Sequence, residues 1–481
     1  MNTKMIRYIL GKMLGAEALL LMLPALVGAI YGEHEGISFL IPAMMLVCIY
    51  FFTGRKKPEK TTIYGKDGMV IVALAWLLWS VFGALPFVIS REIPDYIDAL
   101  FETVSGFTTT GSSILTDVEA LSKCMLFWRS FTHWVGGMGV LVFVLMLTSL
   151  DKNSSMYLMT AEVPGPEKEK LAPKMMSTAR ILYGIYFGMT ILQTILLLFG
   201  GMNLFDSLLH AFGTAGTGGF SNYAASVGHF DSAYIDVVVS VFMILFGINF
   251  SLFYMLLLRE FKGVWKNEEL RAYLLIITVS TLLIAMNISG QFASPLKAFR
   301  YALFQVASII TTTGYATADF VQWPMFSKCI LLLLMVTGAC ASSTGGGIKV
   351  SRVLIILKTI KREIKQMTHP KSVSIIRVNG KKMGTDVIRR VCAYLMAYAV
   401  VAIGSILLVS IDNKDFATTF SSVMATLNNI GPGIGAVGPA GNFAEFSVFS
   451  KLIFCIDMLA GRLELFPFLM LITLPVWKKQ F

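Results

Sequence analysis

Long apolar stretches recur along the whole of this 481-residue chain and restrict what it can fold into. They lie at roughly 6–30, 37–53, 68–90, 124–150, 181–200, 235–258, 272–288, 328–341, 391–411 and 448–475. Most are long enough to cross a bilayer as a helix, and lipid requires every backbone polar group to find a partner inside the protein. Because 56% of the residues are hydrophobic and 14% are charged, one soluble core could not bury the apolar surface. The stretches predict an all-α integral membrane protein.

The first stretch has two interpretations. Lys4, Arg7 and Lys12 stand at its start, as in the charged region of a signal peptide. Glu17 interrupts the stretch, however, and a second apolar segment follows at once. We therefore predict that residues 1–54 form a two-helix N-terminal extension.

The distribution of positive charge predicts the topology. Residues 352–390 carry eleven Lys or Arg and two acidic residues, whereas 201–234 carry no Lys or Arg. Cytoplasmic loops of membrane proteins hold the excess of Lys and Arg, so both termini and 352–390 are placed in the cytoplasm. The formal net charge of +11 is explained by this topology, and no nucleic-acid partner is expected.

Four short polar loops, each with a glycine, interrupt the apolar sequence on the predicted outer side. They read TTTGS at 108–112, GTGGF at 216–220, TTTGY at 311–315 and NNIGP at 428–432. Each follows a segment too short to cross a bilayer, and these segments are 95–107, 204–215, 296–310 and 415–427. The loops recur at intervals of 95 to 117 residues, and such repetition indicates a duplicated unit.

The predicted fold is four pseudo-repeats of helix, pore helix, filter loop and helix around one pore. The repeats are assigned to 55–150, 151–260, 261–367 and 368–481, after the extension at 1–54. Non-helical backbone at membrane depth survives where it is buried in protein or lines a water-filled path. A ring of four loops would meet that condition.

The loops have the composition of a cation filter. Aligned backbone carbonyls can replace the hydration shell of an ion, glycine permits the necessary backbone angles, and threonine adds a hydroxyl oxygen. The predicted ion-binding residues are Thr109, Thr110, Gly111, Thr217, Gly218, Gly219, Thr312, Thr313, Gly314, Asn429, Ile430 and Gly431. The alternative is that the glycines belong to ordinary loops or close helix contacts. Recurrence of four similar loops favours the filter.

Two further features lie on the predicted cytoplasmic side of the loops. The ten residues 338–347, GACASSTGGG, interrupt an apolar stretch and cannot hold a helix at low cost. A simple bend rarely needs ten small or polar residues, so their number favours a distinct structural element over a bend. Arg462 lies in the last apolar stretch, where a charge costs roughly 2.5–3.5 kcal/mol, so it should face a pore or a partner. Asp457 and Glu464 are the candidate partners.

Together these motifs resemble the Trk/Ktr/HKT superfamily of potassium transporters over 55–481, and the extension resembles that of its TrkH-type branch. The resemblance implies that K⁺ and Rb⁺ are taken up across the cell inner membrane through a channel-like pore, without enzyme activity or a bound cofactor. Gly111 favours potassium, because serine at this position accompanies sodium transport in the superfamily. It also implies a gate below the filter, made of Gly345, Gly346, Gly347, Lys349 and Arg462.

The resemblance further implies a homodimer and a cytoplasmic nucleotide-binding (TrkA-type) regulatory subunit. No nucleotide-binding fingerprint is visible in this chain. Segment 352–390 would suit that subunit or anionic membrane lipid. The alternative function is an ion-coupled secondary symporter or antiporter, which would need acidic residues in its spans, here mainly Asp457 and Glu464. An intramembrane enzyme would need a nucleophile beside a base, and the spans offer no such constellation.

Overall fold

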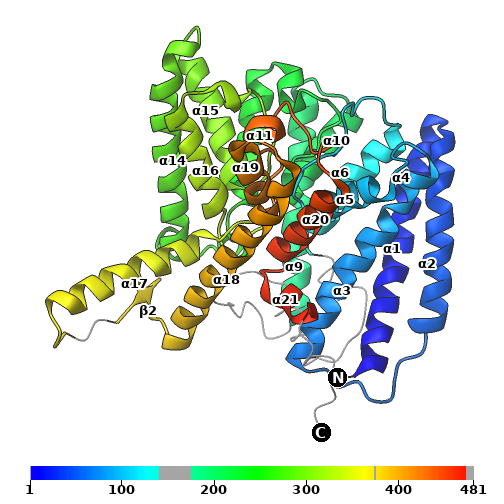
Figure 1. The fold of residues 1–481 in the computed structure, drawn as a ribbon, viewed down its shortest axis with the longest axis horizontal. Coiled ribbons are helices and arrows are strands. Elements are labelled where there is room, and N and C mark those ends of the chain that lie inside the picture. Colours follow the sequence, from blue (N-terminus) through cyan, green and yellow to red (C-terminus); the bar gives the residue numbers. More distant parts are fainter. Residues whose placement is uncertain (1, 140–174, 373–374, 473–481) are drawn as a thin grey trace.

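The structure is a computed structural model that describes residues 2–139, 175–372 and 375–472, and these are mostly helical, with almost no strands (Figure 1). Within these residues six helical segments are long and apolar enough to cross a membrane. They are Thr3–Tyr31, His34–Thr53, Gly65–Ile89, Arg180–Phe199, Glu268–Gln291 and Thr385–Asp412. All six coincide with predicted apolar spans, so the all-α membrane architecture is confirmed.

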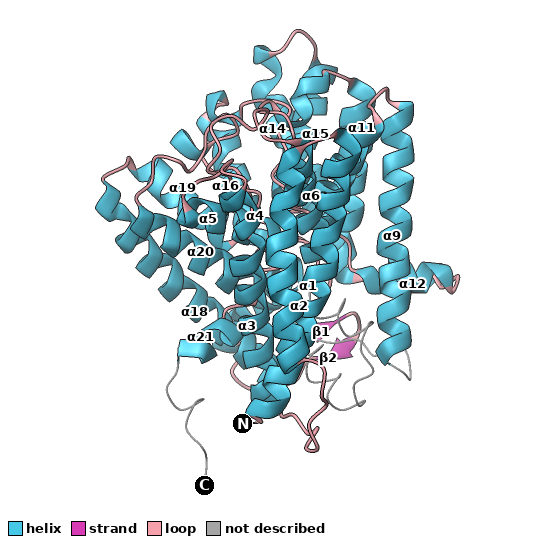
Figure 2. Cartoon of the chain, turned by 90° about the vertical axis from the view of Figure 1, so that its right-hand side faces the viewer, coloured by secondary structure: helices cyan, strands magenta, loops and turns pink. Residues whose placement is uncertain are grey.

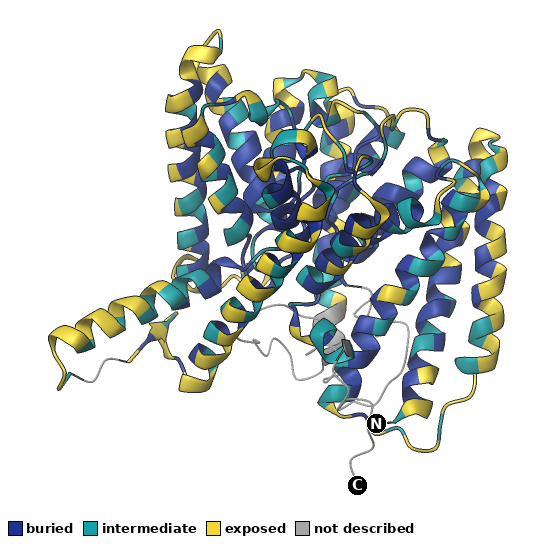
Figure 3. Ribbon diagram, in the orientation of Figure 1, coloured by how far each residue is buried: buried dark blue, intermediate teal, exposed yellow. Residues whose placement is uncertain are grey.

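The longer helices run roughly side by side through the molecule, with their buried faces toward its interior (Figures 2 and 3). They are α1 (Thr3–Tyr31), α2 (Leu40–Thr53), α3 (Gly65–Gly83), α6 (Lys123–Gly137), α9 (Met175–Phe199), α14 (Glu268–Ile288) and α18 (Thr385–Val409). The shorter connecting elements are η1 (His34–Phe39), α4 (Leu85–Ile89), η2 (Ser226–Phe230), α13 (Phe261–Trp265), η3 (Ser289–Gln291), η4 (Phe320–Gln322), η5 (Ser410–Asp412) and η6 (Gly435–Val437).

Four short helices precede the four polar loops, as predicted. They are α5 (Tyr96–Phe107), α10 (Leu204–Gly216), α15 (Pro295–Ile310) and α19 (Phe416–Leu427). Each begins at a residue whose side chain accepts a hydrogen bond from the first turn, and these residues are Asp95, Asn203, Ser294 and Asp415. Their C-terminal halves are buried, so the loops that follow them lie deep in the molecule.

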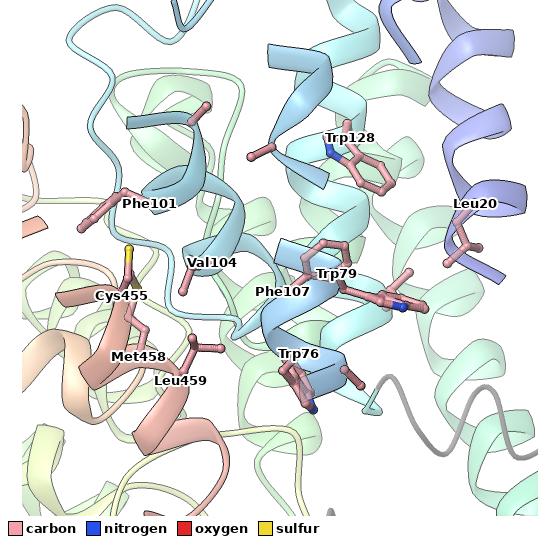
Figure 4. Close-up of a cluster of buried hydrophobic side chains, with 14 of the residues drawn as sticks. Leu20, Trp76, Trp79, Phe101, Val104, Phe107, Trp128, Cys455, Met458 and Leu459 are labelled. Atoms are coloured by element: carbon pink, nitrogen blue, oxygen red, sulfur yellow. The ribbon is translucent and has the colours of Figure 1, made fainter. Parts of the chain in front are cut away.

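Aromatic packing fixes the depth of α5. Phe107, its last residue, lies 5.5 Å from the Trp79 ring of α3 and 5.8 Å from the Trp128 ring of α6 (Figure 4). Trp128 Nε1 donates to Gly83 O at 3.0 Å, so its polar edge is satisfied inside the apolar cluster. The other side of α5 faces α20 (Val448–Arg462), where Met458 is fully buried.

One predicted span, 235–258, is not a continuous helix. It forms α11 (Ala233–Phe246) and α12 (Phe250–Leu257), which meet at an angle of 92°. The backbone groups freed at the break are bonded by the 338–347 segment, since Gly247 O accepts from Cys340 N and Phe250 N donates to Ser342 O, both at 3.1 Å. Asn249 caps α12 through Ser251 N at 2.9 Å. The bend is therefore set by tertiary contacts.

Two other predicted spans are also interrupted. The stretch 328–341 belongs to α16 (Met325–Thr337), which stops at Gly338 with φ of 70°. The stretch 448–475 is α20 followed by α21 (Phe466–Ile472), and Glu464 and Leu465 between them have φ of 56° and 62°. In the stretch 124–150, residues 140–150 lie outside the described residues, as does the proposed boundary between repeats one and two.

A basic helix and a small hairpin extend from one end of the molecule. Helix α17 (Val350–Thr368) projects beyond the bundle in Figure 1, and it leads to the antiparallel strands β1 (Arg377–Val378) and β2 (Lys381–Lys382). The hairpin returns the chain to α18. This end carries the basic segment predicted to be cytoplasmic.

Candidate functional site

The four polar loops meet in a closed ring. A Cβ atom on Gly111 would collide with Gly218 O, and one on Gly219 would lie 3.0 Å from the carbonyl carbon of Gly314. A Cβ on Gly314 would lie 2.9 Å from Gly431 N, and one on Gly431 would lie 2.9 Å from Gly111 O. Loop one thus contacts loop two, two contacts three, three contacts four, and four contacts one. The glycines are needed because the loops approach one another so closely.

The short helices all end in the same backbone geometry. The residues at the turn have left-handed φ between 54° and 59°, and they are Thr109, Thr217, Thr312 and Asn429. The next N–H then bonds back to the carbonyl five residues earlier, as in a Schellman motif. These bonds are Thr110 N to Ser105 O (2.9 Å), Gly218 N to Gly213 O (2.8 Å), Thr313 N to Ser308 O (2.8 Å) and Ile430 N to Ala425 O (2.8 Å). The four short helices therefore end with the same backbone geometry, and each loop leaves its helix in the same orientation.

Beyond the helix ends, three loops share a second left-handed residue. The φ angles are 81° at Gly111, 77° at Gly219 and 83° at Gly314, two positions after the left-handed threonine in each case. Such alternation turns successive carbonyls toward the same side, which suits a carbonyl-lined ion path. Gly431 has no left-handed φ, and it precedes Pro432, which pushes the residue before it toward extended angles. The fourth loop therefore departs from the other three.

Threonine hydroxyls form hydrogen bonds within and between the loops. Thr108 and Thr110 in loop one are joined through their Oγ1 atoms at 2.8 Å, and Thr311 and Thr313 in loop three repeat this pair at 2.8 Å. Asn429 Nδ2 donates to Thr110 Oγ1 at 3.0 Å, so loop four is tied to loop one by side chains. Asn429 stands where the other three loops have threonine, and its side chain thus links loop four to loop one.

On one side of the ring lies a cavity of about 140 Å³ that all four glycines line. Arg129 of α6 is buried and also lines this cavity. The site residues predicted from the sequence did not include it. Arg129 Nε pairs with Glu102 Oε1 at 2.6 Å, and Arg129 Nη1 donates to Ser221 O at 3.0 Å. The guanidinium also lies 3.8 Å from the centre of the Phe220 ring. Its position as a lone arginine in an apolar stretch could have identified Arg129 as a candidate site residue from the sequence.

Two acidic residues on or before the short helices make structural contacts. Asp98 on α5 pairs with Lys451 of α20 at 2.5 Å. Asp415 caps α19 by accepting from Thr418 N at 3.0 Å, and hydrogen bonds from Thr418 lower the pKa of the Asp415 carboxyl below its ordinary value. Asp415 therefore stays ionised while it fixes the start of α19.

The predicted gate residues lie on the other side of the ring. A cavity of about 100 Å³ is lined there by Gly345, Gly346, Gly347, Lys349 and Arg462, together with Trp76 and neighbouring residues. The segment contacts the loops directly, because Gly346 N donates to Thr312 Oγ1 at 2.6 Å and Gly347 N donates to Asn428 O at 3.1 Å. The ten small residues therefore form a buried loop under the ring, and the simple bend does not describe them.

Two cations line this inner cavity. Arg462 Nη1 donates to Thr344 O at 2.8 Å, and Nη2 donates to Gly137 O at 3.0 Å and to Gly136 O. The Lys349 ammonium, which is 2% exposed, donates to Gly345 O. Both side chains thus bind backbone carbonyls around the gate segment.

The acids proposed as partners of Arg462 make other contacts. Asp457 Oδ1 accepts from Ser405 Oγ at 2.7 Å, between α20 and α18. Glu464 Oε2 accepts from Arg352 Nη2 of α17 at 2.7 Å. Both carboxylates therefore have structural partners. In the part of the chain that the structure describes, no group of three or more His, Cys, Asp or Glu could hold a metal ion.

Comparison with known proteins gives one consistent result. The family model described as a cation transport protein, TrkH, matches residues 38–476. The Trk system potassium uptake protein TrkH of Salmonella typhimurium is 37% identical over 470 residues, which cover 95% of this chain and 96% of the relative. The Trk system potassium uptake protein TrkG of Escherichia coli K12 is 33% identical over 488 residues, which cover 99% of this chain and all of the relative.

A solved structure agrees with these relatives. The crystal structure of the potassium transporter TrkH from Vibrio parahaemolyticus superimposes with a TM-score of 0.88 and 34% sequence identity. The match covers 99% of this chain and 100% of that chain.

Proposed function

This chain belongs to the TrkH family of cation transport proteins, and we propose that it takes up potassium through a channel-like pore formed by its four polar loops. The observation that carries the proposal is the closed ring, whose four glycines line one cavity while the loops contact one another in cyclic order. Relatives over nearly the full length are named as potassium uptake proteins. Fold, ring and relatives support the same transport function.

The ions would be bound by backbone carbonyls and threonine hydroxyls of the twelve predicted filter residues. Alternating left-handed residues in loops one to three support carbonyls directed into a common path. Gly111 is present, and its place in the ring leaves no room for a side chain. We propose K⁺ and Rb⁺ as substrates, with looser discrimination against Na⁺ than in a symmetric channel because loop four differs.

The gate is proposed to be the 338–349 segment together with Arg462. This segment bonds to loops three and four from the inner side, and Arg462 donates to its Thr344 carbonyl. The positive charges of Lys349, which is buried, and Arg462, which is half-buried, raise the energy of a cation that permeates beside them, because like charges repel strongly where water is excluded. The structure would then correspond to a closed pore.

We propose that opening is controlled from the cytoplasmic side. A nucleotide-binding regulatory subunit of the TrkA type would dock on the basic segment 352–390, of which α17 projects beyond the bundle (Figure 1). Anionic lipid would suit the same charges. We also propose a homodimer in the cell inner membrane, with both termini in the cytoplasm and the repeats divided as predicted.

One observation favours the ion-coupled alternative. The Asp457 side chain is fully buried in α20, and among the described residues its Oδ2 has no hydrogen-bond partner. A buried carboxylate of this kind could exchange a proton during transport. Its Oδ1 bond to Ser405 accounts for only half of the carboxylate. Coupling therefore has to be tested together with selectivity.

The experiment is cation flux into proteoliposomes that hold the purified chain, under a negative-inside potential. Uptake of K⁺ and Rb⁺ driven by the potential, worth about 2.3 kcal/mol per charge per 100 mV, is expected without any other gradient. Na⁺ should be taken up less. Transport that requires an opposing proton or sodium gradient would contradict the channel-like pore and support a coupled carrier.

A further inference from the structure

One carboxylate anchors both ends of the gate segment to α14. Glu269 lies in the first turn of that helix and is 6% exposed. Its Oε1 accepts a hydrogen bond from Ala341 N at 2.7 Å and another from Ser351 N at 3.1 Å. These donors lie before and after Gly345–Gly347 in the sequence. A single side chain therefore holds the two ends of the loop together.

The bond to Ser351 also completes the start of α17. The first N–H groups of a helix lack intrahelical acceptors, and the N-cap side chain usually supplies one. Here the N-cap is Lys349, which makes no capping hydrogen bond because an ammonium has no acceptor. Glu269 supplies the acceptor from another helix, and its negative charge is favourable at a helix N-terminus. This explains why an acid is buried at this position.

The segment that Glu269 holds is strained. Two of its residues other than glycine, Ser342 and Lys349, have left-handed φ of 54° and 82°. Left-handed conformations at residues other than glycine cost free energy and persist only where surrounding contacts hold them. When the side chain that holds both ends of the segment is removed, less strained conformations of the segment become more populated. The strain thus makes the position of the loop depend on its anchors.

We infer that Glu269 is a positioning residue of the gate, whose carboxylate keeps Gly345–Gly347 under the ring by binding both ends of the segment. This inference rests on the proposed function, because it assigns a role within that pore. Glu268 offers a matched control. In the described part of the chain it contacts α17 and the hairpin, since its carboxylate pairs with Lys358 and its N–H donates to Asn379 Oδ1 at 2.7 Å.

The test is Rb⁺ flux into proteoliposomes that contain the full chain without any cytoplasmic partner. Glu269→Ala removes two charge-assisted hydrogen bonds, and we expect basal flux to rise about tenfold or more. Glu269→Gln keeps an acceptor oxygen but loses the charge, so a smaller rise is expected. Glu268→Gln should leave basal flux at the wild-type value. The preference for K⁺ over Na⁺ should be unchanged in all variants, because none touches the ring.

The outcomes separate the inference from the proposed function. Wild-type basal flux in folded Glu269→Ala and Glu269→Gln proteins, checked by gel filtration, would overturn the positioning role while leaving the pore intact. Raised flux with lost K⁺ preference would also overturn it, since that pattern indicates general disruption. If Glu269→Ala does not fold, Glu269→Gln decides. Absence of K⁺ and Rb⁺ flux in the wild-type protein under every condition would refute the proposed pore itself.

Discussion

Replacing Gly314 by alanine should disable the ring while leaving the rest of the protein folded. Gly314 has φ of 83°, and an added Cβ would lie 2.9 Å from Gly431 N and 3.0 Å from Pro432 Cδ. The nearest neighbours are backbone and ring atoms of loop four, which cannot rotate away as a flexible side chain could. The methyl group must therefore push loops three and four apart or force Gly314 into another conformation.

Two free-energy costs set the size of the effect of Gly314→Ala on the native ring. A left-handed φ costs an L-residue with a Cβ about 1–2 kcal/mol, and overpacking a tight site costs about 1–3 kcal/mol. Together they disfavour the native ring by about 2–5 kcal/mol. At 1.4 kcal/mol per factor of ten, the population of the native filter falls roughly 30-fold to a few thousand-fold. Uptake of K⁺ should fall at least tenfold, and the residual flux should discriminate poorly against Na⁺.

The assay is K⁺, Rb⁺ and Na⁺ flux in proteoliposomes, with Gly404→Ala as a matched control. Gly404 lies in α18, and a Cβ there would have no neighbour within 4 Å among the residues that the structure describes. Because alanine is a better helix former than glycine by about 1 kcal/mol, this control should keep wild-type flux and stability. Wild-type uptake and selectivity in Gly314→Ala would refute the assignment of the loops as a filter, since the added methyl group would then be harmless at a close contact between loops three and four.

Three further predictions concern the surroundings of the ring. Arg462→Ala should raise K⁺ flux with the gate open, because a cation beside the inner path is removed; unchanged flux in the liposome assay would exclude a barrier role. Deleting several residues from 338–347 should make the pore conductive without a regulatory partner, and flux that still depends on the partner would show that this segment is not the gate. Arg129→Ala should lower the free energy of unfolding by about 3–5 kcal/mol, since it leaves the Glu102 carboxylate buried without its ion-pair partner. A melting temperature equal to that of the wild type would contradict this reasoning.

The features that depend on local sequence could be predicted. The four short helices were expected at 95–107, 204–215, 296–310 and 415–427, and each lies within one residue of that range at both ends. Their starts are marked by capping residues, and their ends by the polar loops. Six membrane spans were equally clear, because length and hydropathy alone define them.

The features that depend on distant contacts could not be predicted. The 92° bend after Phe246 is stabilised by hydrogen bonds to Cys340 and Ser342, roughly ninety residues later, and hydropathy shows a continuous stretch there. Local sequence does not distinguish Glu102 from the other acidic residues, and only the fold reveals that it is buried against Arg129. The roles of the ring and gate residues, and the limits of the repeats, stay predictions until transport is measured.

The left-handed threonines connect the ring to the gate. A helix that ends in a Schellman motif usually places glycine at the left-handed position, because a β-branched residue is strained there. Three of the four short helices instead use Thr109, Thr217 and Thr312. At Thr312 the hydroxyl accepts the Gly346 N–H from the gate segment at 2.6 Å, so the strained residue joins the end of the short helix, the ring and the loop beneath it. A displacement of the gate breaks this bond and removes a contact that holds Thr312 in its strained conformation. We therefore expect the gate and the third filter loop to change conformation together.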